Sequence, residues 1–129
     1  MGIHKLFSII ESPRHPDFSG LYKRLGFEET RLGSIRKANA QLKKQLPDIV
    51  VAEFIYGYGS NYSGVHISNL DVFLVSLMKY KSHASVIVMA DKSERKFVNK
   101  LNEIYPLTTV LEFPVNEKVL ENCLIDIRQ

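Results

Sequence analysis

The chain has 129 residues, a length that fits one compact domain spanning residues 1–129. With 45% hydrophobic and 24% charged residues and a formal net charge of +3, the composition excludes an intrinsically disordered chain. No apolar run approaches the roughly 20 residues of a membrane-spanning helix, and residues 1–6 lack the apolar region of a secretory signal, so we expect a cytoplasmic location.

The first part of the chain alternates strands with helices. In chain order we expect a strand at 5–10, a helix at 17–25, a strand at 27–32 and a helix at 34–46. Asp17 and Ser34 are the expected N-caps of the two helices, and Gly26 ends the first. The second helix has an apolar face made of Ile35, Ala38, Leu42 and Leu46.

The alternation continues to the end of the chain. The expected elements are a strand at 49–53, a helix from Asn69 or Asp71 to 78, a strand at 85–90, an amphipathic helix at 92–105, a strand at 108–113 and a helix at 116–127 capped by Asn116. Strands that read as apolar runs between helices predict a parallel sheet covered on both faces. Five such units fit a flavodoxin-like, doubly wound α/β fold with strand order 2-1-3-4-5.

In such a sheet, ligands and chemistry gather at the carboxyl ends of the strands. There Pro47 and Asp48 precede an apolar run that ends in one carboxylate, Glu53, and Phe113-Pro114 precedes the last helix. Together with the order of elements, these features resemble the receiver domains of two-component response regulators over essentially the whole chain. The resemblance implies a signalling domain rather than an enzyme, with a histidine kinase or another regulator as partner. In that family, the position of Glu53 is normally the aspartate that accepts a phosphoryl group.

The other positions that carry receiver chemistry depart from the family's pattern. The first strand is followed by Glu11 and a serine, so one carboxylate remains of the acidic pair that holds a divalent metal; Asp91 could supply another acid. The resemblance implies a hydroxyl, an aromatic switch residue and a lysine where this chain has Met89, Val110 and Phe113. The sequence leaves the isomer of the bond before Pro114 open.

Glutamate is one methylene longer than aspartate, which moves the carboxylate of Glu53 out of the geometry of in-line phosphoryl transfer. We therefore expect a degenerate pseudo-receiver that acts by phosphorylation-independent protein–protein interaction, with no resident cofactor or metal. Three alternatives stay open: a phosphorelay receiver that still accepts phosphate, a small-ligand or cofactor binder with a flavodoxin-like fold, and a Glu53 that is merely solvated. Weak binding of Mg²⁺ by Glu53, Glu11 and Asp91 is a further possibility.

Two surfaces are candidates for partners. The segment 57–64 is longer than the median connection of roughly 4 to 6 residues, and its neighbourhood is rich in aromatic residues. We expect a contact with a partner or ligand at Tyr56, Tyr58, Tyr62 and His66. The resemblance also implies a homodimer surface formed by 92–105, 108–113 and 116–127.

A basic stripe is expected on the polar face of the second helix. It consists of Arg36, Lys37, Lys43 and Lys44. Such a stripe could meet nucleic acid or an acidic partner. Because no recognised nucleic-acid motif accompanies these charges, we do not expect nucleic-acid binding.

Overall fold

A computed structural model describes residues 4–12, 16–57 and 68–128 of the chain. Five parallel strands form one sheet in the order β2-β1-β3-β4-β5. They are β1 (Lys5–Ile9), β2 (Glu28–Leu32), β3 (Ile49–Glu53), β4 (Ser85–Ala90) and β5 (Thr109–Glu112). The predicted flavodoxin-like fold and its strand order are confirmed.

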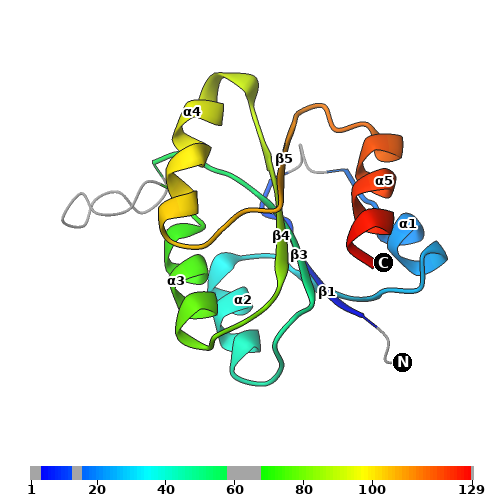
Figure 1. Ribbon diagram of the computed structural model, residues 1–129, viewed down its shortest axis with the longest axis horizontal. Helices are drawn as coiled ribbons and strands as arrows, with labels where there is room; N and C mark the ends of the chain where they lie inside the picture. Colours follow the sequence, from blue (N-terminus) through cyan, green and yellow to red (C-terminus); the bar gives the residue numbers. More distant parts are fainter. Residues whose placement is uncertain (1–3, 13–15, 58–67, 129) are drawn as a thin grey trace.

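Helices cover both faces of this sheet, as Figure 1 shows in an edge-on view. The helices are α1 (Ser19–Arg24), α2 (Ile35–Leu42), α3 (Asp71–Lys79), α4 (Arg95–Val98) and α5 (Glu117–Arg128). One face carries α2, α3 and α4, and the opposite face carries α1 and α5 (Figure 1). Among the described residues, no helix has the length and apolar character needed to cross a membrane.

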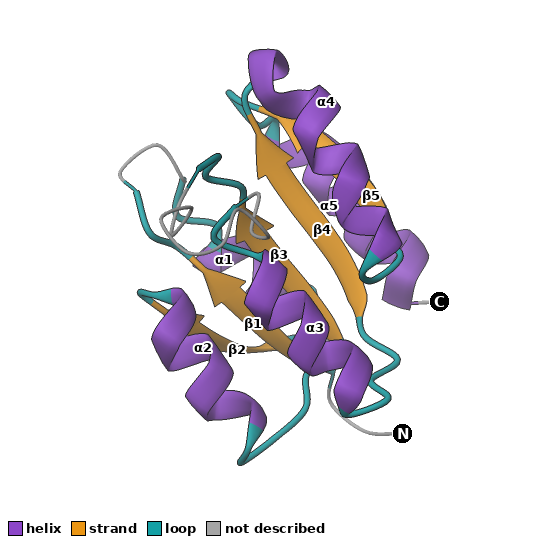
Figure 2. Cartoon of the chain, turned by 90° about the vertical axis from the view of Figure 1, so that its left-hand side faces the viewer, coloured by secondary structure: helices purple, strands orange, loops and turns teal. Residues whose placement is uncertain are grey.

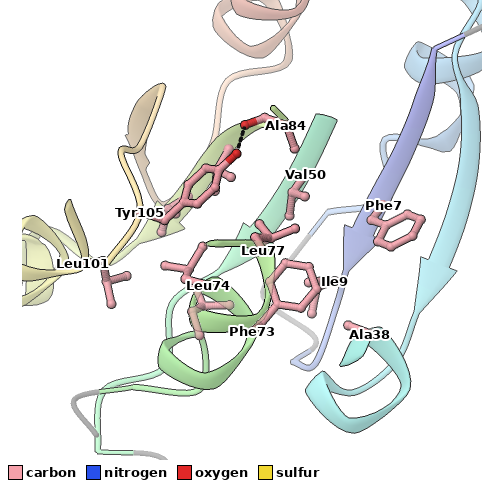
Figure 3. Packing of buried hydrophobic residues seen from close by; sticks show 14 of the residues in the cluster. Phe7, Ile9, Ala38, Val50, Phe73, Leu74, Leu77, Ala84, Leu101 and Tyr105 are labelled. Atoms are coloured by element: carbon pink, nitrogen blue, oxygen red, sulfur yellow. Dashed lines mark hydrogen bonds between the residues drawn. The ribbon is translucent and has the colours of Figure 1, made fainter. Parts of the chain in front are cut away.

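The alternation of side chains along the buried strands creates two hydrophobic cores. Val50 and Ala52 of β3 belong to the core under α2, α3 and α4, whereas Ile49 and Val51 belong to the core under α1 and α5. Figure 3 shows the first core, where Phe73, Leu74 and Leu77 of α3 pack against the sheet. In the same core, the hydroxyl of Tyr105 donates a hydrogen bond of 2.7 Å to the carbonyl oxygen of Ala84 (Figure 3). These contacts fix β3 at the centre of the sheet.

Two of the three predicted N-caps are confirmed. The Ser34 side chain accepts a hydrogen bond of 3.2 Å from the amide of Lys37, and Asn116 Oδ1 accepts one of 2.8 Å from the amide of Lys118. The prediction for Asp17 was wrong, because Phe18 is the N-cap of α1 and the Asp17 carboxylate binds the amide of Ser19 at 2.9 Å and the guanidinium of Arg31 at 3.0 Å.

Two predicted helices differ from the observed ones. The second helix ends at Leu42, and Leu46 is 40% exposed rather than part of the buried face. Pro47 opposes a helix that runs to Leu46, because a proline disfavours helical geometry in the residue before it. The segment 92–105 is not one helix: the 3₁₀ turns η1 (Lys92–Glu94) and η2 (Asn99–Glu103) flank α4. The Asn102 side chain donates to the Asn99 carbonyl oxygen and accepts from the amide of Leu107, so it competes with helical backbone bonds.

Candidate functional site

Glu53 is the last residue of β3, and its carboxylate lies at the carboxyl edge of the sheet with 2% of the residue exposed. One carboxylate oxygen, Oε1, accepts hydrogen bonds from the amide of Glu11 at 2.7 Å and from the amide of Ser12 at 2.5 Å. The other, Oε2, accepts a bond of 2.5 Å from the Ser12 hydroxyl. The interpretation of Glu53 as a solvated surface carboxylate was therefore wrong. Its side chain ties the segment after β1 to the end of β3.

The side chain of Glu11 turns toward other partners. Its Oε1 accepts a hydrogen bond of 2.8 Å from Asn69 Nδ2, and its Oε2 accepts one of 3.3 Å from the amide of Ile35, the first residue of α2. A carboxylate at this place is favourable, because the first amides of a helix lack partners within the helix and carry partial positive charge. Glu11 thus supports the start of α2 while its backbone amide binds Glu53.

Asn69 connects the two carboxylates to the segment after β3. Its Nδ2 also donates to the carbonyl oxygen of Glu53 at 2.9 Å, and its Oδ1 accepts from the amide of Ile55 at 2.8 Å. The residue is 3% exposed, so these bonds are made away from water. The sequence indicated Asn69 only as a possible first residue of the helix. Its role as the link between Glu11 and Glu53 was missed.

A buried pair of polar residues, Ser68 and Asp71, lies at the start of α3. Asp71 Oδ1 accepts hydrogen bonds from the amide of Ser68 at 2.6 Å and from its hydroxyl at 2.8 Å, and the two residues are 3% and 4% exposed. The Ser68 hydroxyl oxygen in turn accepts from the amide of Leu70 at 3.1 Å. This local network holds the entry to α3, and with it Asn69, in one position.

These residues do not fit the oxygen-rich shell that a divalent metal requires. In the segment after β1, two amides and a hydroxyl donate hydrogen bonds to the Glu53 carboxylate. Hydrogen-bond donors direct positive charge at the carboxylate, where a metal site would need oxygen ligands. Asp91 lies in the turn after β4, where its carbonyl oxygen accepts from the amide of Glu94. Within the described ranges, no group of three His, Cys, Asp or Glu residues is placed to hold a metal ion.

The positions at which the sequence departs from the receiver pattern belong to the cores. Met89 pairs with Glu53 across β3 and β4, is 0% exposed and packs in the core under α1 and α5. Val110 of β5 is partly buried against the other core. Phe113 packs against the same core as Met89 and precedes a cis bond to Pro114. Apolar side chains therefore stand where the resemblance implies a hydroxyl, an aromatic switch and a lysine.

Tyr56 is the only residue of the predicted contact loop that lies in the described ranges; Tyr58, Tyr62 and His66 lie outside them. Its ring is stacked on Phe97 of α4, with 4.1 Å between the centroids and 24° between the planes. Lys96 Nζ lies 5.2 Å from the centroid of the Phe97 ring. Tyr56 is nevertheless 48% exposed. Its ring therefore presents an aromatic surface next to α4.

Comparison with known proteins supports the fold. A scan of the sequence against models of protein families finds no match, and neither does a search among curated proteins. Solved receiver structures, in contrast, superpose over nearly the whole chain. The chemotaxis response regulator CheY4 of Vibrio cholerae has a TM-score of 0.72 at 16% identity and covers 98% of this chain and 99% of its own.

Two further structures show the same likeness. The signal receiver domain of a putative Luxo repressor protein from Vibrio parahaemolyticus has a TM-score of 0.73 at 14% identity, with 97% of this chain and 89% of that chain covered. The receiver domain of the Francisella response regulator 1452 has a TM-score of 0.70 at 12% identity and 97% coverage of both chains. The chain thus has the CheY-like fold of response-regulator receiver domains, and the resemblance inferred from the sequence is confirmed at the level of the fold.

Proposed function

We propose that this chain is an atypical receiver-like signalling domain that acts through protein–protein contacts without being phosphorylated. The proposal rests chiefly on Glu53. Its carboxylate, at the position that the resemblance equates with the phosphoacceptor, is buried and accepts hydrogen bonds from Glu11 and Ser12.

A carboxylate in this state is a poor acceptor of a phosphoryl group. To attack a phosphorus atom, the Glu53 carboxylate would first have to give up hydrogen bonds that it accepts. A hydrogen bond to an ionised group is worth about 1.5–3 kcal/mol. Phosphoryl transfer also depends on cations that offset the charge of the transferred group. Met89 and Phe113 provide neither a cation nor a hydroxyl where the resemblance implies such groups.

The same contacts suggest what replaces phosphorylation. Glu53 connects the segment after β1 with the end of β3, and Asn69 extends this connection to the start of α3. The carboxyl edge of the sheet is thereby held in one arrangement by the chain's own side chains. We propose that partners recognise this constant state, and that the partner is a kinase or regulator of a signalling system.

The homodimer through α4, β5 and α5 also stays a proposal; an ion pair of 3.0 Å between Arg95 and Glu112 lies on that surface.

The test is the intact mass of the protein after incubation with Mg²⁺ and acetyl phosphate, next to an ordinary receiver as positive control. We expect no added phosphoryl mass on the wild type. The Glu53→Asp variant should also stay unmodified, because Met89 and Phe113 remain. A labile adduct of one phosphoryl group on the wild type would contradict the proposal and favour the phosphorelay alternative.

A further inference from the structure

Helix α3 is apolar on its outward side as well as on its inward side. Phe73, Leu74 and Leu77 face the core with at most 1% exposure. Val72, Val75 and Met78 are 44%, 38% and 49% exposed. A helix that covers a sheet normally has a polar outer face, so the fold itself does not require this second apolar row.

The exposed residues form one continuous row. Val72, Val75 and Met78 are three positions apart, and side chains at that spacing are neighbours on a helix surface. Tyr80, which is 45% exposed, follows the helix directly. Figure 2 shows α3 in the middle of its face of the molecule, between α2 and α4. The row therefore lies at the centre of a broad surface.

A depression of about 360 Å³ adjoins the end of this row. Met78 contributes to its wall together with His83, Tyr105 and Pro106. The Tyr105 hydroxyl is already bonded to the Ala84 carbonyl oxygen at 2.7 Å, so this side chain offers an apolar ring rather than an unpaired hydroxyl. The wall also includes Ser82, Ser85 and Thr108, so the depression, which has the size of a small binding pocket, suits a side chain that carries both apolar and polar groups.

Exposed bases lie on or next to α3 and the two helices beside it. They are Arg36, Lys37, Lys43 and Lys44 on the side of α2, Lys79 and Lys81 at the end of α3, and Lys96 and Lys100 on the side of α4. In the described part of the chain, none of these eight residues forms an ion pair. Arg95 of α4 differs from them, because it pairs with Glu112 at 3.0 Å. The positive charge around α3 is thus available to a partner.

We propose that this surface, the α3 face formed by Val72, Val75, Met78, Tyr80 and the neighbouring bases, binds an acidic amphipathic segment of a partner protein. Apolar side chains of the segment would cover the row, a side chain with both apolar and polar groups would enter the depression, and the carboxylates of the segment would meet the lysines. An apolar centre with a charged rim is the usual anatomy of a protein–protein interface. A nucleic-acid duplex would bind chiefly through its phosphates, which the aliphatic row of Val72, Val75 and Met78 does not engage. The inference deepens the proposed function by naming a surface and the chemistry of its partner, and it rests on that function only for the expectation of a protein partner.

The probe is a synthetic helical peptide with leucine at every third or fourth position and glutamate between, measured by fluorescence anisotropy and by amide chemical shifts. We expect binding that weakens with salt and shifts the amides of 72–81. The double variant Val75→Gln/Met78→Gln and the single variant Lys79→Glu should each weaken binding about tenfold, or about 1.4 kcal/mol. The matched controls are Val119→Gln, at an apolar residue of α5 that is 47% exposed, and Lys23→Glu on α1. They should leave the affinity unchanged.

Four outcomes would overturn the inference. The first three are that the acidic peptide does not bind, that a peptide with lysine in place of glutamate binds equally well, and that the control variants lose as much affinity as the test variants. The fourth is that a single-stranded oligonucleotide or phosphatidylserine vesicles bind, with an affinity that the Val75→Gln/Met78→Gln change does not alter. Failure here is distinct from failure of the proposed function, because the phosphorylation test depends on Glu53 and not on α3.

Discussion

Replacement of Glu53 by alanine should lower the free energy of unfolding by about 3–5 kcal/mol. The substitution leaves the amides of Glu11 and Ser12 and the Ser12 hydroxyl without the acceptor that they have in the wild type. Because the site is 2% exposed, water cannot readily take the place of the carboxylate. Urea denaturation followed by circular dichroism measures the change.

Two variants accompany this measurement as controls. Glu53→Gln keeps an acceptor oxygen but loses the charge, so we expect about 1–2 kcal/mol of destabilisation. Glu28→Ala removes an exposed carboxylate that forms an ion pair with Lys5, and it should cost at most about 1 kcal/mol. If Glu53→Ala were no more destabilising than Glu28→Ala, the buried connection between β3 and the segment after β1 would not exist in solution.

The second large effect is expected for Asn69→Asp, with a loss of about 3 kcal/mol at neutral pH. Asn69 Nδ2 donates to Glu11 Oε1 at 2.8 Å and to the Glu53 carbonyl oxygen at 2.9 Å. Aspartate has no donor and places a second negative charge against Glu11. Burial and the neighbouring Glu11 raise the pKa of the introduced carboxyl above its ordinary value of about 4, and as the pH falls through this raised pKa, protonation restores a donor and removes the repulsion. The stability difference from the wild type should therefore shrink in acid.

The same chemical change at Asn116 provides the control. There the side chain is an N-cap whose Oδ1 accepts from the amides of Lys118 and Val119. Aspartate caps a helix as well as asparagine does, so Asn116→Asp should be neutral or slightly stabilising at pH 7. Equal losses for the two variants, or a loss at Asn69 that does not change with pH, would speak against the contacts assigned to Asn69.

The fold was predictable because local patterns and long-range packing agree. Residues 49–52 are apolar at consecutive positions, as expected for a strand covered on both faces, and all five residues of β3 are buried. Ser34 is a cap whose geometry depends on a few neighbouring residues only. The segment 92–105 shows where prediction from apolar spacing fails. The spacing indicates one continuous helix, but it does not reveal that the Asn102 side chain binds backbone groups and so competes with helical hydrogen bonds.

For the site, the sequence located Glu53 but not its partners. Ser12 is 41 positions away from Glu53, and Asn69 is 58 positions away from Glu11, so only the folded chain brings them together. The one available signal was the cluster of polar residues Ser68, Asn69 and Asp71 at the start of an apolar helix. The outward row of α3 was missed for a related reason, because an apolar pattern does not by itself separate the buried residues from the exposed ones.

Hydrogen exchange of the Glu11 and Ser12 amides, followed by NMR, tests whether the Glu53 carboxylate holds the segment after β1. We expect both amides to exchange slowly, as buried strand amides do, and to keep their chemical shifts when Mg²⁺ is added. Rapid exchange at both amides, or shifts induced by Mg²⁺ at Glu11, Ser12 and Glu53, would show that the carboxylate is open and would contradict the account.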